Sequence, residues 1–158
     1  MSRITELLNA GPTLIMSLPA NDPDLARAAK AGGADALKVH IRVHHAASGT
    51  HFGTLEEERE RLEEIIKLFP GPVGIVAGAE TPATPQEMIA MRRMGIDFFD
   101  LYASHMPAWM WRIEGMGRAV ALEPIYSVHQ AIALENLGVD VIEAAIIPHE
   151  GYGKPLTV

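Results

Sequence analysis

A repeated pattern constrains the fold of this chain more than any other feature. Short apolar segments alternate with amphipathic segments along the whole sequence. A Gly-x-Asp sequence stands where an amphipathic segment gives way to an apolar one at Gly33–Asp35, Gly95–Asp97 and Gly138–Asp140. Glycine at such a point suits the left-handed residue that ends many helices. Helices and strands that alternate in this way predict parallel strands joined by right-handed crossovers, which is an α/β fold.

The periodicity places the individual elements. Strands are predicted at 12–20, 36–43, 72–80, 96–104, 118–126 and 140–147. Helices are predicted at 2–9, from Pro23 onward, at 55–69, 85–95 and 128–138, with a short Trp-rich helix after the fourth strand. Asp22 is a candidate N-cap, and Thr54–Glu57, Thr84–Glu87 and Ser127–Gln130 have the spacing of capping boxes or caps.

Two architectures fit these elements, an open doubly wound sheet and a TIM-type (β/α)8 barrel. Central strands of a doubly wound sheet are covered on both faces and read as continuous apolar runs. Here, the second strand alternates apolar residues with Lys38, His40 and Arg42, and polar residues recur in the second half of other strands. This pattern favours a barrel whose inner face becomes polar toward its C-terminal mouth.

The predicted barrel has about six βα units, whereas a full barrel has eight. We therefore expect residues 1–158 to form a single (β/α)-barrel domain that is incomplete at its C-terminus. The open doubly wound parallel sheet remains the alternative.

The inward-facing lysine is the first candidate for chemistry. Lys38 inside a barrel must be paired with a carboxylate, or its pKa falls. Plausible partners lie on neighbouring predicted strands: Glu80, Asp100, Glu123 and Glu143. The candidate catalytic residues beside Lys38 are Glu80, Asp100 and Glu123. A lysine can polarise a carbonyl oxygen while a carboxylate moves a proton on the adjacent carbon. The lysine could instead form a Schiff base, or the pair could simply be a structural ion pair.

Substrate-binding candidates come from strand ends and from the polar loop at 44–53. The glycines and hydroxyls of this loop, together with the helix that begins after Thr54, could bind a phosphate or carboxylate. The alternative is a solvent-exposed loop that binds no ligand. The candidate substrate-binding residues are His40, Arg42, His44, Ser48, Gly49, Thr50, His51, Tyr102, Glu143 and His149.

A histidine cluster supports a second hypothesis, a divalent metal site. His40, His44, His45 and His51 lie within twelve residues of sequence. No H-E-x-x-H or comparable spacing is present. The chemistry proposed for the lysine requires no cofactor. A divalent metal bound by the histidines remains the alternative.

Bulk composition limits the partners. The formal net charge of −7 argues against nucleic acid or an anionic membrane as the main partner, although a local pocket can still bind a small anion. The chain has no cysteine, no signal-peptide pattern and no apolar run of membrane-spanning length, so we expect a cytoplasmic protein. Open sheet edges and the residues Trp109, Met110 and Trp111 predict a homo-oligomer.

The pattern resembles the phosphate-binding TIM-barrel group and, within it, the N-acetylmannosamine-6-phosphate 2-epimerases. The similar features are Lys38 in "ALKVH", Asp100 in "FFDLYAS" and Gly151–Tyr152 in "IIPHEGYGKPLT". The resemblance implies a barrel that epimerises a phosphosugar with a lysine and a glutamate. The loop "HHAASGTHFG" has no counterpart in that family, and the family's glutamate and main phosphate site lie on later strands than this chain supplies.

Three classes of function follow. The leading hypothesis is an isomerase, epimerase or aldolase (a lyase) of carbohydrate metabolism, acting on a small phosphorylated sugar or a related hydroxy-carbonyl compound. The second is a metal-dependent lyase or hydrolase that uses the histidine cluster. The third is a non-catalytic binding protein with a barrel-like fold.

Overall fold

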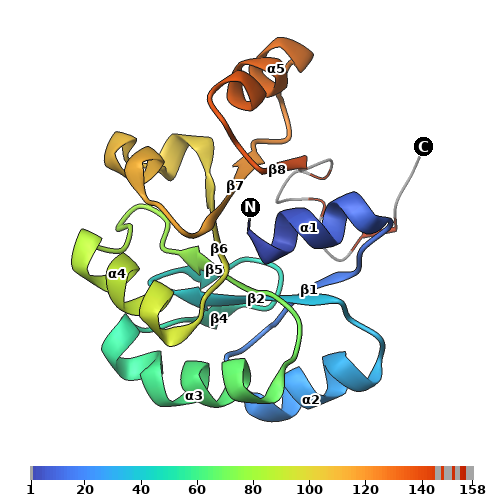
Figure 1. Ribbon diagram of the computed structural model, residues 1–158, viewed down its shortest axis with the longest axis vertical. Coiled ribbons are helices and arrows are strands. Elements are labelled where there is room, and N and C mark those ends of the chain that lie inside the picture. Colours follow the sequence, from blue (N-terminus) through green and yellow to red (C-terminus); the bar gives the residue numbers. More distant parts are fainter. Residues whose placement is uncertain (1, 145–146, 148–150, 152–153, 156–158) are drawn as a thin grey trace.

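A six-stranded parallel sheet forms the centre of the computed structural model, which describes residues 2–144, 147, 151, 154 and 155 (Figure 1). The strands stand side by side in chain order, β1-β2-β5-β6-β7-β8, and every neighbouring pair is parallel. They are β1 (Ile15–Ser17), β2 (Ala36–Ile41), β5 (Val73–Ala77), β6 (Phe98–Tyr102), β7 (Gly117–Leu122) and β8 (Val141–Ala144).

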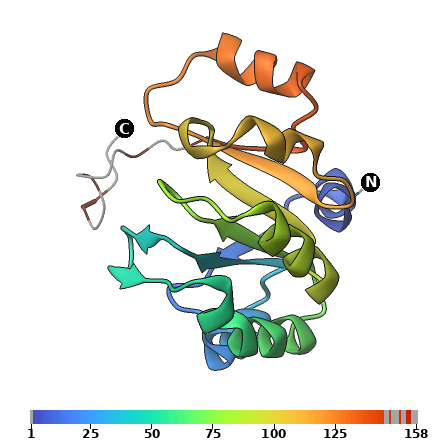
Figure 2. The same cartoon turned by 90° about the vertical axis from the view of Figure 1, so that its left-hand side faces the viewer.

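This strand order distinguishes the two predicted architectures. A doubly wound sheet reverses its strand order partway across, and no reversal occurs among these six strands. The sheet instead curls into a half-barrel, with α2 (Pro23–Ala31), α3 (Leu55–Leu68) and α4 (Pro85–Met94) on its convex side (Figure 2). The TIM-type half-barrel prediction is confirmed, and the open doubly wound alternative is wrong.

The helices begin where the sequence predicted. The side chains of Thr54, Thr84 and Ser127 each accept a hydrogen bond from the backbone N–H three residues on, and each capping box is complete. Pro85 occupies the first turn of α4, where its missing N–H costs nothing. Ser127 opens α5 (Val128–Asn136), which has no fully buried residue.

The main core lies between the strands and the outer helices. Alternate residues of β2 point outward, and Leu37, Val39 and Ile41 are fully buried there. They belong to one apolar cluster with Leu62 of α3 and Met91 of α4. The same alternation turns Ala36, Lys38 and His40 toward the concave side, so it decides which residues can form a site.

The N-terminal end of the half-barrel is closed by helix α1 (Arg3–Ala10). The backbone N–H groups of Arg3 and Ile4 donate to the two carboxylate oxygens of Asp97, at 3.1 and 2.8 Å. Asp35 and Asp140, the other aspartates of the Gly-x-Asp repeats, accept hydrogen bonds from the backbone N–H groups of Leu14 and Arg118 at 2.8 Å. The first and third repeats therefore join the beginnings of neighbouring strands, and the second joins β6 to helix α1.

Two connections differ from the predictions. The predicted loop at 44–53 contains a small antiparallel hairpin, β3 (His44–His45) and β4 (Thr50–His51). The link between β6 and β7 contains two 3₁₀ helices, η1 (Ala103–His105) and η2 (Ala108–Arg112), of which the second carries both tryptophans. Trp109 packs against the main core, so at least this tryptophan covers the core.

Other aspects of the fold remain predictions. Strands β1 and β8 form the two edges of the sheet as far as the chain is described. The homo-oligomer, the single-domain assignment, the missing C-terminal units and the cytoplasmic location are untested. Of the described helices, none combines the length and the apolar character needed to cross a membrane.

Candidate active site

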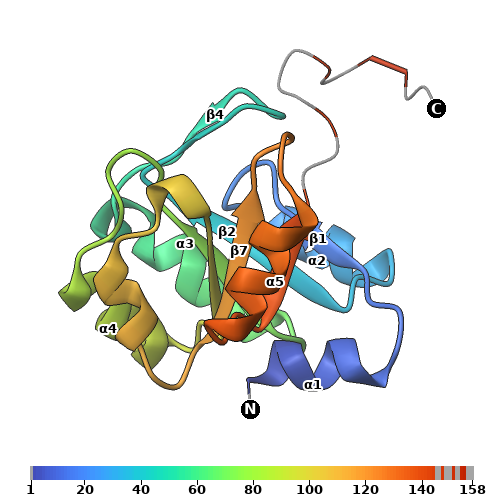
Figure 3. The ribbon, with the colours of Figure 1, turned by 90° about the horizontal axis from the view of Figure 1, so that it is seen from above.

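A cavity of about 640 Å³ opens at the C-terminal end of the strands. Each of the six strands contributes at least one lining residue, and the hairpin β3–β4 adds His44 and His45. In Figure 3 this hairpin and helix α1 lie at opposite ends of the molecule. The volume is in the range of ordinary small-molecule sites, and the position is where barrel enzymes place their active sites.

The residues that flank the longer side chains of the cavity differ between β5 and β7. Gly74 of β5 stands beside Lys38 in the register, and Val76 stands beside Asp100. Strand β7 likewise presents Ala121 next to Glu143. The Phe98 ring fills the space beside Gly74, whereas Ala121 leaves room for Glu143 to reach Lys38.

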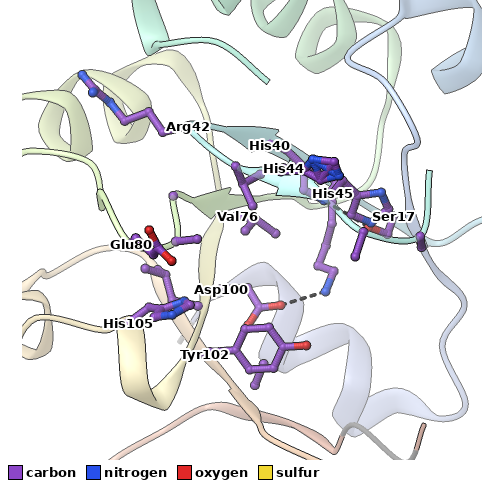
Figure 4. Close-up of a pocket in the computed structure, with 18 of the residues that line it drawn as sticks. Ser17, His40, Arg42, His44, His45, Val76, Glu80, Asp100, Tyr102 and His105 are labelled. Carbon is purple, nitrogen blue, oxygen red and sulfur yellow. Dashed lines mark hydrogen bonds and ion pairs between the residues drawn. The ribbon is translucent and has the colours of Figure 1, made fainter. Parts of the chain in front are cut away.

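Lys38, Asp100 and Glu143 meet at this point. The Lys38 Nζ donates to Asp100 Oδ2 at 2.8 Å, which is the dashed contact at Asp100 in Figure 4. The same Nζ also forms an ion pair with Glu143 Oε2. The Asp100 side chain is only 4% exposed and that of Lys38 13%, whereas that of Glu143 is 50% exposed. The buried lysine is thus held between one enclosed and one accessible carboxylate.

The three groups influence one another's ionisation. Burial raises the pKa of Asp100 to about 7, with hydrogen bonding to Glu143 in support and the charge of Lys38 in opposition. Burial by itself would lower the pKa of Lys38 and raise the pKa of Glu143. Nevertheless, the two carboxylates raise the pKa of Lys38, and hydrogen bonding with Asp100 and the lysine charge lower that of Glu143. These directions favour a charged lysine, an ionised glutamate and an aspartate that keeps its proton well above the pH usual for a carboxyl.

His40 forms a neutral wall of the cavity. Its ring is buried, stacks on Phe52 with ring centroids 4.6 Å apart, and lies 3.3 Å from Ser17 Oγ through Nε2. Burial, with the nearby His45 and Lys38, lowers the pKa of His40 to about 3. Its Nδ1 has no hydrogen-bond partner within the described part of the chain.

Arg42 departs from the predicted inner face. Strand β2 ends at Ile41, and Arg42 takes the left-handed backbone conformation, with φ of +52°. Its guanidinium turns to helix α4 and forms an ion pair with Glu87 Oε1 at 2.7 Å. Figure 4 shows it directed away from Asp100. Arg42 lines the cavity at its rim, but the strict alternation with Lys38 and His40 breaks at this turn.

The two other predicted carboxylates occupy different places. Glu80 is exposed on the loop after β5 and lines the cavity. Glu123 follows the end of β7 and accepts a hydrogen bond from Ser104 Oγ at 3.2 Å. Glu123 is not among the described residues that line the cavity. Tyr102 lines it from the last position of β6.

The far half of the predicted loop turns toward the chain after β1. The hydroxyls of Ser48 and Thr50 donate to the Pro19 carbonyl at 3.1 and 2.7 Å, and Gly49 forms the left-handed turn between them. His51 is paired with His44 across the hairpin. These residues anchor the hairpin, and only its near half lines the cavity. His149 lies outside the described residues.

Among the polar lining residues, sequence reasoning missed Ser17, Thr81 and His105. Ser17 is the last residue of β1 and stands beside Lys38 in the register, so the alternation within its predicted strand could have found it. His105 ends η1 and its ring meets that of Tyr102 edge-on, with centroids 6.1 Å apart. No periodic signal marks a residue in such a short turn.

The histidine cluster does not converge on one point. Within the described residues, no three histidine, aspartate or glutamate side chains are arranged to hold a metal ion. His40 packs against His45 with centroids 4.7 Å apart, while His44 contacts His51. The four-histidine site of the metal hypothesis is therefore not formed by these residues.

Comparison with known proteins adds a fold-level match. No family model matches the chain, and no curated protein matches it in sequence. Among solved structures it is similar to the crystal structure of KGPDC from Streptococcus mutans, which is that of a complex with a bound ligand. The match has a TM-score of 0.59 and 15% identity, and it covers 90% of this chain and 68% of that one. At this identity the match shows the shared TIM-barrel fold.

Proposed function

We propose that this protein is an enzyme that moves a proton on a carbon next to a carbonyl group, as an isomerase or epimerase of a small anionic hydroxy-carbonyl compound. The observation that carries the proposal is the cluster of Lys38, Asp100 and Glu143 at the mouth of the half-barrel. It combines a fixed positive charge with two carboxylates in a cavity large enough for a sugar phosphate.

Each group has a role in this chemistry. Glu143, ionised and half-exposed, takes the proton from the carbon. The electron pair moves onto the carbonyl oxygen, where the Lys38 ammonium stabilises the developing negative charge. Asp100 holds the lysine and exchanges a proton with Glu143. Return of the proton to the opposite face gives epimerisation. Its return to the neighbouring carbon gives isomerisation when the hydroxyl proton also moves from one oxygen of the enediolate to the other.

The state of Lys38 favours this route over Schiff-base aldolase chemistry. A Schiff base needs a neutral amine, whereas two carboxylates raise the pKa of Lys38 and keep it protonated. The alternative remains testable, because borohydride traps such an adduct as a covalent modification of the lysine.

The fold match supports the choice of substrate class. The similar structure is that of a sugar-phosphate decarboxylase. Loss of carbon dioxide next to a carbonyl and proton removal next to a carbonyl both leave an enediolate, so a related barrel suits either reaction. We therefore infer a phosphorylated sugar as the first substrate to test.

The test is hydrogen exchange with solvent. Wild-type protein is incubated in D₂O with triose, pentose and hexose phosphates, both aldoses and ketoses, and deuterium uptake next to the carbonyl is followed by NMR. We expect uptake on at least one substrate, its loss in Lys38→Met, and its retention in Lys30→Met, which removes an exposed lysine of α2. Binding without uptake would support a non-catalytic role, and borohydride trapping at Lys38 would support the aldolase route.

A further inference from the structure

The hairpin β3–β4 carries histidines that the proposed proton transfer does not use. His44 and His51 stand directly opposite each other in its antiparallel register. Both side chains are exposed to solvent. The hairpin is fixed at its base, because the Arg42 N–H donates to the Gly53 carbonyl at 2.7 Å and Phe52 N–H to the Val43 carbonyl at 2.9 Å. The hairpin therefore holds the two imidazoles side by side.

The distance between their nitrogens is informative. His44 Nδ1 lies 3.1 Å from His51 Nε2, and the rings meet edge-to-face with centroids 4.1 Å apart. Two nitrogens bound to one ion at about 2.0–2.1 Å stand about 2.8 Å apart at a right angle and about 3.4 Å apart at a tetrahedral angle. The observed separation lies between these limits.

We propose that His44 and His51 form a two-histidine binding site for a divalent transition-metal ion at the rim of the cavity. Imidazole nitrogen suits Zn²⁺, Cu²⁺ and Ni²⁺, whereas Mg²⁺ and Ca²⁺ prefer oxygen. Water completes the coordination, since no third ligand side chain joins the pair among the described residues. The site is independent of the proton-transfer proposal.

Binding requires the hydrogen bond between the two rings to open, so that the lone pairs of both facing nitrogens turn toward one ion. In the hydrogen-bonded pair, one ring donates its N–H to the other ring's lone pair. When the donor ring carries its proton on its other nitrogen, both facing nitrogens have free lone pairs. Metal and proton compete for these lone pairs, so acidification weakens binding.

The bound ion would act on the cavity. His44 and His45 line it from the hairpin, and an ion joining the two strands would stiffen this wall. By linkage, any ligand that binds only the folded chain also stabilises it, in proportion to the logarithm of its concentration above Kd.

The test uses metal binding and no substrate. Zn²⁺ is titrated into the full chain at pH 7.5 by calorimetry, with Mg²⁺ in parallel, and Cu²⁺ is added for EPR spectroscopy. We expect one Zn²⁺ per chain, no Mg²⁺ binding, a two-nitrogen Cu²⁺ signal, and an affinity that falls by at least about tenfold at pH 5.5. His44→Ala and His51→Ala should each weaken Zn²⁺ binding by about tenfold or more, which is about 1.4 kcal/mol.

The matched control is His129→Ala, an exposed histidine on α5. This variant should bind Zn²⁺ like the wild type, and the thermal midpoint of each metal-free variant verifies that it is folded. Absence of Zn²⁺ binding, or equal affinity in wild type and His51→Ala, would overturn the site. Neither result bears on Lys38, so the two proposals succeed or fail separately.

Discussion

The two ends of the half-barrel interior are built from the same strands yet differ in chemistry. At the N-terminal end, Ala36, Phe98 and Ala119 pack with Ile4 of α1 in a buried apolar cluster. Two residues further along β2 and β6 stand Lys38 and Asp100. The inward face of a strand repeats every second residue, so one step along it separates a core that stabilises the fold from a site that can carry out a reaction.

The difference indicates where stability is gained and where it is given up. Burying apolar side chains at the N-terminal end is favourable. Enclosing an ion pair has a desolvation cost that its mutual attraction only partly offsets. The proposed function would account for this cost in stability. The two ends should therefore respond differently to substitution.

The largest expected effect is on activity, at the mouth. Lys38→Met keeps the length of the side chain and removes its charge, so the developing oxyanion loses its partner. We expect kcat/KM for the substrate found by deuterium exchange to fall by about 10²–10⁴, with the protein still folded by circular dichroism. Unchanged turnover would show that the lysine is structural.

At the N-terminal end, a substitution is expected to lower stability and to leave activity unchanged. Phe98 is 2% exposed, and a Cβ added at Gly74 would lie only 2.1 Å from its ring, so the two strands are in close contact there. Phe98→Ala should lower the free energy of unfolding by about 3–5 kcal/mol, measured by urea denaturation. The kcat of the folded fraction should stay near the wild-type value; a loss like that of Lys38→Met would mean that the two ends are not separate.

The pH dependence of stability distinguishes the ends in another way. The pKa of Asp100, about 7 when folded, lies above its ordinary value. Its contribution to stability is therefore complete below about pH 4 and is lost as the pH rises to about 7. Asp100→Asn removes this contribution. The stability of the wild type should therefore exceed that of the variant most near pH 4, and this difference in stability should shrink toward pH 7.

Thermal midpoints measured across this pH range test the trend. The control is Asp24→Asn, whose side chain is 83% exposed. A difference in thermal midpoint between wild type and Asp100→Asn that does not change with pH, or that grows toward pH 7, would contradict the raised pKa of Asp100.

The smallest effect is expected just outside the cavity. Glu123 bonds to Ser104 and does not line the cavity, whereas Glu143 pairs with Lys38. Glu143→Gln should lower kcat/KM by about 10²–10⁴, and Glu123→Gln should leave it within about twofold of the wild type. Equal losses in the two variants would mean that the cavity closes differently when substrate binds.

The sequence predicted the architecture well because periodicity encodes it. The capping boxes at Thr54 and Thr84, the Gly-x-Asp repeats and the alternation in β2 are local signals, and they were sufficient for the half-barrel. The inward direction of Lys38 followed from the same alternation. Asp100 and Glu143 were among the carboxylates predicted as its partners, but the sequence could not tell which of the four candidates would reach the lysine, because that depends on how far each side chain extends across the neighbouring strand.

Two local features could not be predicted from the periodicity of the sequence. The left-handed turn at Arg42 breaks the strand and redirects the following residues into a hairpin. The sequence shows an arginine there, where glycine would be the usual sign of positive φ. For the same reason, the grouping of His44 with His51 and of His40 with Phe52 became apparent only from the structure.

The most direct test of the account is the titration of Asp100 itself. The protein is labelled with ¹³C at the aspartate carboxyl groups, and the Asp100 signal is assigned by its absence in Asp100→Asn. Its chemical shift is then followed from pH 3 to pH 9. We predict a midpoint near pH 7, because burial raises the pKa of this carboxyl. A midpoint near pH 4, the ordinary value for aspartate, would contradict a proton-exchanging centre at the mouth of the barrel.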